Sequence, residues 1–133
     1  MKVFLDSNVW LAAVVFPGLC AELVLELDAR GHRLLTSALV RAEVRGVIQR
    51  KFKRHAAAWE RFDSLWACAL CVPDLAEPAQ DADARLVAAA LGASAQLFIT
   101  GDQRVLGWHP QGPMGIVSPR QAWQEVVLPE PPD

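Results

Sequence analysis

The chain has 133 residues, of which 53% are hydrophobic, enough for one domain with a sizeable core. Its longest apolar run, Val9 to Phe16, is far shorter than the roughly 20 residues of a membrane-spanning helix, and Asp6 interrupts the apolar N-terminus, so we expect a cytoplasmic protein. The net charge of −2 is unevenly divided: residues 30–61 hold nine lysines and arginines against two acids, a net of +7, and the remainder nets −9.

Strand and helix patterns alternate in the first half. In chain order they predict a strand from Lys2 to Leu5, a helix toward Phe16, a helix from Leu19 to Arg30, a strand from Arg33 to Thr36, helices over 38–50 and 56–66, and a strand from Ala69 to Val72. Pro17-Gly18 and Gly31 end the first two helices, and Ser37 can cap the third.

The second half continues the alternation. It predicts a helix from Asp83 to Leu91, a strand from Gln96 to Thr100, a short helix over 103–107, a strand from Gly115 to Val117 and a last helix from Ser118-Pro119. Strands separated by helices predict an α/β fold in three layers, a parallel sheet with helices on both faces. We expect a single domain over 1–127 and a proline-rich tail over 128–133.

Two acidic residues directly follow predicted strands. Asp6 comes after Val-Phe-Leu, and Asp102 comes after Leu-Phe-Ile-Thr-Gly. In a parallel sheet, ligands bind beyond the carboxyl ends of the strands, which is where both carboxylates would lie. Each could instead cap the helix that follows. The matched placement of the two favours a functional site.

Glu43 and Asp83 are further candidates. Glu43 lies at the edge of the apolar stripe of its predicted helix, where a carboxylate needs a partner; a salt bridge to Arg50 is the alternative to a metal ligand. Asp83, with Asp81 two residues before it, lies at the start of its predicted helix. It could be a metal ligand or, equally, the cap of that helix.

Four carboxylates in one pocket would repel one another unless a cation neutralised them. Magnesium or manganese suits such oxygen ligands, and magnesium held by few carboxylates leaves room for a phosphate. An ion of this kind can activate water and stabilise charge on a phosphate and its leaving oxygen. The four acids therefore indicate phosphodiester hydrolysis without a covalent nucleophile.

These motifs, in this order, resemble those of the PIN-domain family. Within that family, they are most similar to the toxins of type II toxin-antitoxin systems (VapC-like). The resemblance rests on Asp6-Ser7-Asn8, on Glu43 followed by Arg50-Lys51-Phe52, on Asp81-Ala-Asp83 before an apolar helix, on Thr100-Gly101-Asp102 and on Ser118-Pro119. It runs from about Val3 to Trp123.

The resemblance implies a five-stranded parallel sheet of order 3-2-1-4-5, with the first and fourth strands adjacent. It implies an Mg²⁺- or Mn²⁺-dependent ribonuclease that forms a homodimer and is inhibited by a cognate antitoxin protein. By position, the metal ligands would be Asp6, Glu43, Asp83 and Asp102. Ser7, Asn8 and Thr100 would orient these ligands, and Asp81 is a further supporting residue that could take the place of Asp83. Arg104 stands where many relatives have a further acid, which leaves open whether one or two metal ions bind.

Outside the acids, the run 50–55 is the clearest functional candidate. Its basic side chains could contact RNA phosphates, or could simply form a solvated helix end: Arg50, Lys51, Lys53 and Arg54. We expect Trp10, Trp59 and Trp66 to make core or dimer contacts. Cys68 and Cys71 are expected to be reduced thiols packed in the core.

One rival function remains. The chain could be a PIN-like fold kept as a binding or assembly module, with acids that are only structural. The presence of all four acids argues against this alternative, and a metal-dependent cleavage assay separates the two.

Overall fold

The computed structural model describes residues 1–16, 18–75, 81–108 and 112–128. Its elements are β1 Lys2–Leu5, α1 Ser7–Val15, α2 Leu19–Ala29, β2 Arg33–Thr36, α3 Ala38–Lys51, α4 Ala56–Cys68, β3 Leu70–Cys71, α5 Ala82–Gly92, β4 Leu97–Ile99, α6 Gln103–Leu106, β5 Gly115–Val117, α7 Pro119–Ala122 and the π-helix η1 Trp123–Val127. Each strand and helix predicted from the sequence is present, and its ends differ by two residues at most.

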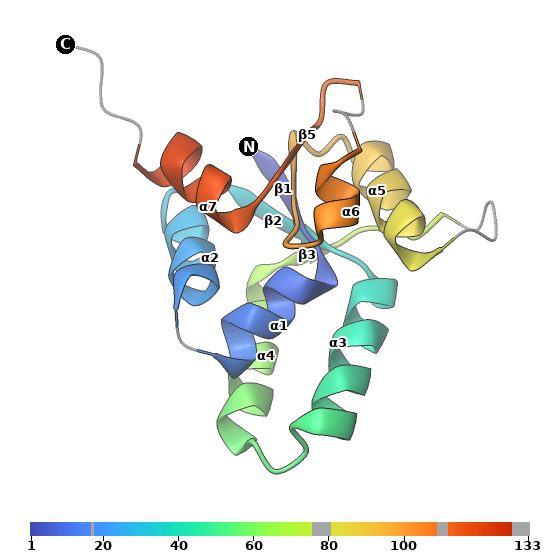
Figure 1. Cartoon of the computed structure of the whole chain (residues 1–133). Helices are drawn as coiled ribbons and strands as arrows, with labels where there is room; N and C mark the ends of the chain where they lie inside the picture. Colours follow the sequence, from blue (N-terminus) through green and yellow to red (C-terminus); the bar gives the residue numbers. More distant parts are fainter. Residues whose placement is uncertain (17, 76–80, 109–111, 129–133) are drawn as a thin grey trace.

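The five strands form one parallel sheet of order β3-β2-β1-β4-β5. Strand β1 is central: Val3 pairs with Leu34 of β2 on one side and with Leu97 of β4 on the other. The helices surround this sheet (Figure 1). The predicted three-layer α/β fold and its strand order are confirmed. The ends of β1 and β4 consequently lie side by side.

The core that fixes these strand ends is aromatic at its centre. Phe4 of β1 stacks on Phe98 of β4, with ring centroids 5.5 Å apart, and both side chains are fully buried. On α1, Trp10 is fully buried against Phe62 and Trp66 of α4. Burying each such side chain contributes about 1.5–3 kcal/mol. The prediction that Trp10 belongs to the core is confirmed.

Helix caps follow the sequence, with one correction. Ser37 accepts a hydrogen bond from the Val40 backbone as predicted. The predicted cap at Asp83 is wrong, because Asp81 caps α5 by accepting from the Ala84 backbone N–H at 2.9 Å. Either aspartate could do this chemically, but Asp81 is the residue with an extended backbone before the first turn. Asp83 therefore lies inside the first turn of α5, with its carboxylate available for other contacts.

The predicted burial of the two neighbouring cysteines is also wrong. Cys68, at the end of α4, and Cys71, in β3, are both exposed free thiols. Strand β3 is the sheet edge, with only two residues, and both of its side chains are exposed. An apolar stretch at a sheet edge has a partner on one side only, so its sequence pattern overstates its burial.

Two further features concern the helices and the chain end. In the described residues no single helix is long and apolar enough to cross a membrane, although α1 and α2 meet that criterion as a pair bent by 104°. Leu128, the first residue of the predicted tail, is exposed, and residues 129–133 lie outside the described residues.

Candidate active site

Asp6 lies at the carboxyl end of β1 and caps α1, and only 2% of it is exposed. Its Oδ1 accepts a hydrogen bond from the Ser7 backbone N–H at 2.7 Å. Its Oδ2 accepts from the Thr100 hydroxyl at 2.7 Å and from the Asn8 side-chain amide at 3.2 Å. Three donors therefore fix both oxygens of a buried carboxylate. Asp6 therefore caps a helix, which was the alternative to a functional role, and it is also the centre of a polar cluster.

The loop after β4 is tied to this cluster by Thr100 and Asn8. The fully buried Thr100 hydroxyl also accepts from the Asp102 backbone N–H at 3.0 Å. The Asn8 side-chain oxygen accepts from the Gly101 backbone N–H at 2.8 Å, and a Cβ on Gly101 would lie 3.4 Å from that oxygen. Asp102 in turn caps α6 by accepting from the Arg104 backbone N–H at 2.8 Å. The ends of β1 and β4 are therefore joined by side-chain hydrogen bonds.

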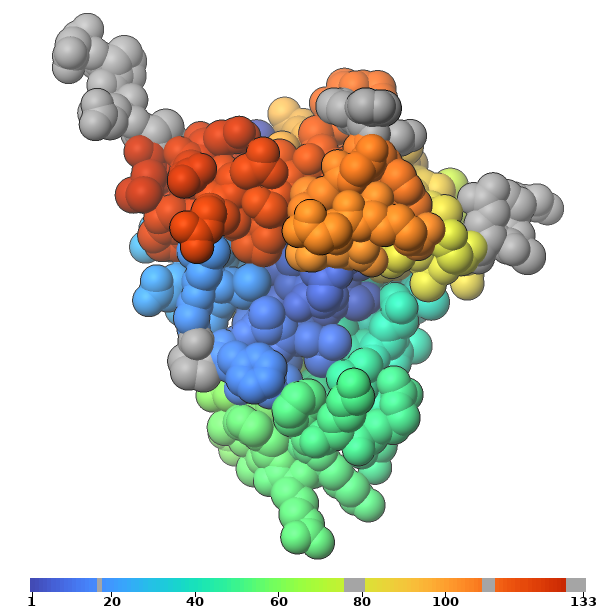
Figure 2. All heavy atoms as spheres, viewed as in Figure 1, coloured from blue at the N-terminus to red at the C-terminus, as the bar shows by residue number. Residues whose placement is uncertain are grey.

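Glu43 reaches the same cluster from α3. Its Oε1 accepts a hydrogen bond from the Ser7 hydroxyl at 2.9 Å, and its side chain is half-buried. The alternative salt bridge to Arg50 is not formed: the salt bridges in the described part of the chain involve other residues. Glu43 therefore faces the start of α1. The start of α1 lies between α3 and α6 (Figures 1 and 2).

Electrostatics connect three of the four predicted acids. Burial is the main cause that raises the pKa of Asp6 above its usual 3.8, against the lowering effect of the Thr100 and Ser7 hydrogen bonds. The negative charges of Asp83 and Glu43 raise the pKa of Asp6 further. The folded chain thus gathers negative charge around a buried carboxylate. A nearby cation would relieve the repulsion.

Arg104 supplies one positive charge at this site, a role that was not predicted from the sequence. Its Nη2 donates to Asp83 Oδ2 at 2.7 Å, and its Nη1 donates to Asp81 Oδ2 at 3.3 Å. The capping hydrogen bond from Ala84, followed by the hydrogen bond from Arg104, lowers the pKa of Asp81. The only sequence signal was a basic residue two positions after Asp102, which by itself does not reveal its partners.

The donor chemistry of the cluster fits a hard divalent cation, since its charged groups are carboxylates. In the arrangement seen, however, no three acidic, histidine or cysteine side chains of the described residues converge closely enough to hold an ion. Glu43 and Asp83 each have one carboxylate oxygen engaged, by Ser7 and by Arg104. Closing the cluster on an ion therefore requires side-chain rotation.

The basic loop between α3 and α4 borders an open surface hollow of about 700 Å³ formed by residues 50–57. Figure 2 shows this connection, in green, at the narrow end of the molecule. Within it, the Phe52 ring packs edge-on against Phe16, with centroids 5.8 Å apart. Phe52 therefore has an aromatic partner already, and the charges of the loop are its main chemical feature.

Two tryptophans on α4 are covered by arginines of α3. Arg41 lies 5.6 Å from the centre of the Trp66 ring, and Arg45 lies 5.2 Å from that of Trp59. Both rings are half-buried. Each has a cationic partner in the chain, as expected of structural residues rather than of surfaces on which bases stack.

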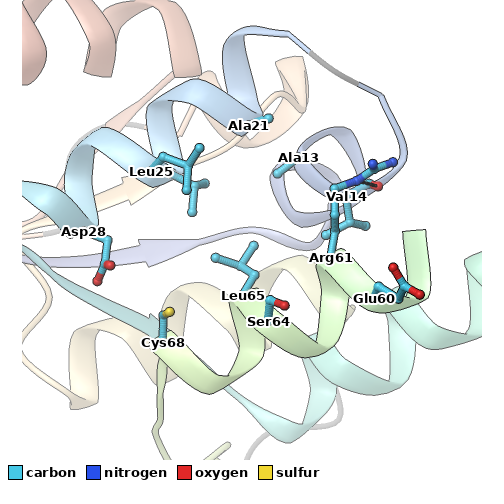
Figure 3. Close-up of a pocket in the computed structure, with 11 residues that line it drawn as sticks. Ala13, Val14, Ala21, Leu25, Asp28, Glu60, Arg61, Ser64, Leu65 and Cys68 are labelled. Carbon is cyan, nitrogen blue, oxygen red and sulfur yellow. Dashed lines mark hydrogen bonds between the residues drawn. The ribbon is translucent and has the colours of Figure 1, made fainter. Parts of the chain in front are cut away.

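A separate cavity of about 390 Å³ lies between α1, α2 and α4 (Figure 3). Its lining is mostly apolar and includes Ala13, Val14, Leu25, Asp28, Leu65 and Cys68. On its wall, Arg61 donates a hydrogen bond from Nε to the Val14 carbonyl at 2.7 Å. None of the acids predicted as ligands lines this cavity, so it is distinct from the carboxylate cluster.

Comparison with known proteins identifies the fold. No model of a protein family matches the chain, and no curated protein matches it. Among solved structures, the crystal structure of VapBC2 from Rickettsia felis, bound to a DNA fragment from their promoter, matches with a TM-score of 0.63. The match covers 89% of this chain and 98% of that chain, at 14% sequence identity. The chain has a PIN-like fold. At 14% identity, the comparison shows the fold alone.

Proposed function

We propose that the chain is a metal-dependent endoribonuclease and the toxin of a type II toxin-antitoxin pair. The observation that carries the proposal is the buried Asp6 carboxylate at the end of β1, hydrogen-bonded to Thr100 and surrounded by the charges of Glu43 and Asp83. A purely structural cap needs neither burial nor two further acids beside it. Such a cluster costs stability, which is typical of functional sites.

The site residues have distinct roles in this proposal. Asp6, Glu43, Asp83 and Asp102 would hold Mg²⁺ or Mn²⁺, which when bound would activate water and offset the charge developing on the phosphate. Thr100 and Asn8 fix the orientation of Asp6, and Ser7 fixes that of Glu43. These hydrogen bonds hold the carboxylates before any substrate arrives, so less ordering remains when RNA binds.

RNA would be bound by the basic loop after α3. Four cationic side chains lie in the last turn of α3 and in this loop: Arg50, Lys51, Lys53 and Arg54. Glu43 and Lys51 are eight residues apart on α3, roughly 12 Å along its axis. A single strand of RNA could therefore extend from the basic residues to the acidic site. Its phosphates would contact the lysines and arginines at one end of this path, and one phosphate would lie near the acids at the other end.

The antitoxin partner and the homodimer belong to the same proposal. The similar solved structure is that of VapBC2 bound to a DNA fragment from their promoter, and it supports a partner protein without giving the identity of that partner. Co-expression with the product of the adjacent gene, followed by size-exclusion chromatography with light scattering, measures both states. If the chain stays monomeric and binds no product of a neighbouring gene, the proposed homodimer and antitoxin partner are both wrong.

The nuclease proposal is tested by incubating the pure protein with a panel of structured RNAs in Mn²⁺ or in chelator. We expect cleavage only with the metal, and loss of cleavage without unfolding in Asp6→Asn and in Asp102→Asn. Arg120→Gln, an exposed residue in the first turn of α7, is the matched control and should cleave normally. Equal cleavage with and without metal, or by Asp6→Asn, would sink the mechanism.

A catalytically silent binding module is the second candidate. The absence of three convergent ligands among the described residues, and the engagement of Asp83 by Arg104, both favour it. Such a module would show no cleavage and no rise in melting temperature with Mn²⁺. A rise in melting temperature that is lost in Asp6→Asn contradicts the silent module.

A further inference from the structure

The guanidinium of Arg104 is held from three sides. Nη2 donates to Asp83 at 2.7 Å, Nη1 donates to Asp81 at 3.3 Å, and the centre of the Trp108 ring lies 5.1 Å from the guanidinium carbon. The side chain is still 53% exposed. A forked pair of hydrogen bonds with an aromatic face behind it is a geometry that the planar guanidinium of arginine fits better than the ammonium group of lysine.

Arg104 also connects the two halves of the acidic site. Its backbone N–H donates to the Asp102 carboxylate at 2.8 Å, while its side chain binds the two aspartates at the start of α5. One residue of α6 thus contacts the acid after β4 and both acids at the start of α5, the cap Asp81 and Asp83 in the first turn. At the opposite end of the site, Asp6 and Glu43 form neither a hydrogen bond nor a salt bridge with Arg104, and their side chains accept hydrogen bonds from Ser7, Asn8 and Thr100.

The consequence for metal binding follows from charge. A divalent ion beside Asp83 would meet a guanidinium already bonded to the same carboxylate, and like charges at such a short separation repel. An ion at Asp6 and Glu43 would meet only carboxylates and neutral donors. The two ends of the site therefore differ in their affinity for a cation.

We propose that Arg104 is the fixed cation at the Asp81–Asp83 end of the site, in the place of a second metal ion, so that the four acids hold one divalent ion, on the Asp6–Glu43 side, rather than two. This inference rests on the proposed metal site. It assigns to Arg104 the positioning of Asp83 and the exclusion of a second ion, and both functions are lost when the guanidinium is removed.

The test counts bound ions directly. Mn²⁺ is titrated into the metal-free protein, and free Mn²⁺ is measured by electron paramagnetic resonance for wild type, Arg104→Gln, Arg104→Lys and the surface control Arg120→Gln. We expect one ion per chain in wild type, Arg104→Lys and Arg120→Gln, and two in Arg104→Gln. Circular dichroism melts without metal verify that each variant is folded, as expected for substitutions at exposed side chains.

Any other set of ion counts contradicts either the role of Arg104 or the proposed metal site. Two ions in wild type, or one ion in both wild type and Arg104→Gln, overturns the role of Arg104 and leaves the metal site intact. No ion in wild type but one in Arg104→Gln also overturns it, because Arg104 would then block the only site. No ion in any variant overturns the proposed function together with the inference. The wild-type count alone decides against the proposal if it is two, whatever the variants do.

Discussion

Replacing Thr100 by valine tests whether its hydroxyl holds the cluster together. The substitution keeps the shape of a fully buried side chain and removes its 2.7 Å hydrogen bond to Asp6 and the acceptor for the Asp102 backbone N–H. A hydrogen bond to a charged group contributes about 1.5–3 kcal/mol, and an unpaired backbone N–H in a half-buried loop adds roughly 1 kcal/mol. We expect the free energy of unfolding to fall by about 2–4 kcal/mol.

The assay is urea denaturation of the metal-free protein, followed by circular dichroism, with the midpoint expected to move and the slope to stay constant. Thr36→Val is the matched control. Thr36 is also fully buried, at the end of the neighbouring strand β2, and its hydroxyl has no hydrogen-bond partner in the described part of the chain. Removing that hydroxyl should leave the stability unchanged or raise it by about 1 kcal/mol.

The pH dependence adds a second criterion. The Thr100 hydrogen bond lowers the pKa of Asp6, so Thr100→Val should raise that pKa further. At acidic pH Asp6 is protonated in both proteins, and the charged hydrogen bond no longer separates them. The stability difference should therefore shrink as the pH falls. Equal losses in Thr100→Val and Thr36→Val, or a difference that does not change with pH, would refute the reasoning.

Three further predictions concern the same side chains and the thiols. The metal-free protein should lose stability as the pH rises through the raised pKa of Asp6, and Asp6→Asn should not show this loss; urea midpoints at several pH values measure it, and the same pH profile in both proteins would contradict it. Ser7→Ala should weaken Mn²⁺ binding roughly 10-fold by releasing Glu43, measured by titration calorimetry, and unchanged affinity would separate Ser7 from the site. A thiol reagent should modify Cys68 and Cys71 quickly and Cys20 slowly, because burial raises the pKa of the Cys20 thiol; equal rates would contradict that burial.

The parts of the fold that could be predicted are those with local causes. The strands preceding Asp6 and Asp102 are short buried runs, and the caps at Ser37 and Ser118 depend on residues within four positions. The strand order was available only through the resemblance, because nothing local in β1 specifies which strands flank it. That order places side by side the two strands that precede Asp6 and Asp102.

The parts that could not be predicted depend on packing between distant segments. Asp81 and Asp83 have the same capping chemistry, and only the backbone path into α5 decides between them. The contacts of Arg104 with Asp81 and Asp83 span 23 and 21 residues and require α5 and α6 to lie side by side. The exposure of Cys71 follows from the position of β3 at the sheet edge, which its apolar sequence does not encode.

The central position of β1 has a consequence for how the chain is made. One neighbour, β2, follows about thirty residues later in synthesis, whereas the other, β4, ends at Ile99. Until then, one edge of β1 has unpaired backbone groups, which are templates for association with other chains. The hydrogen bond between Asp6 and Thr100 joins residues 94 positions apart, and such distant contacts form slowly. A nascent chain therefore passes through a period in which it is prone to aggregate and has no assembled carboxylate cluster.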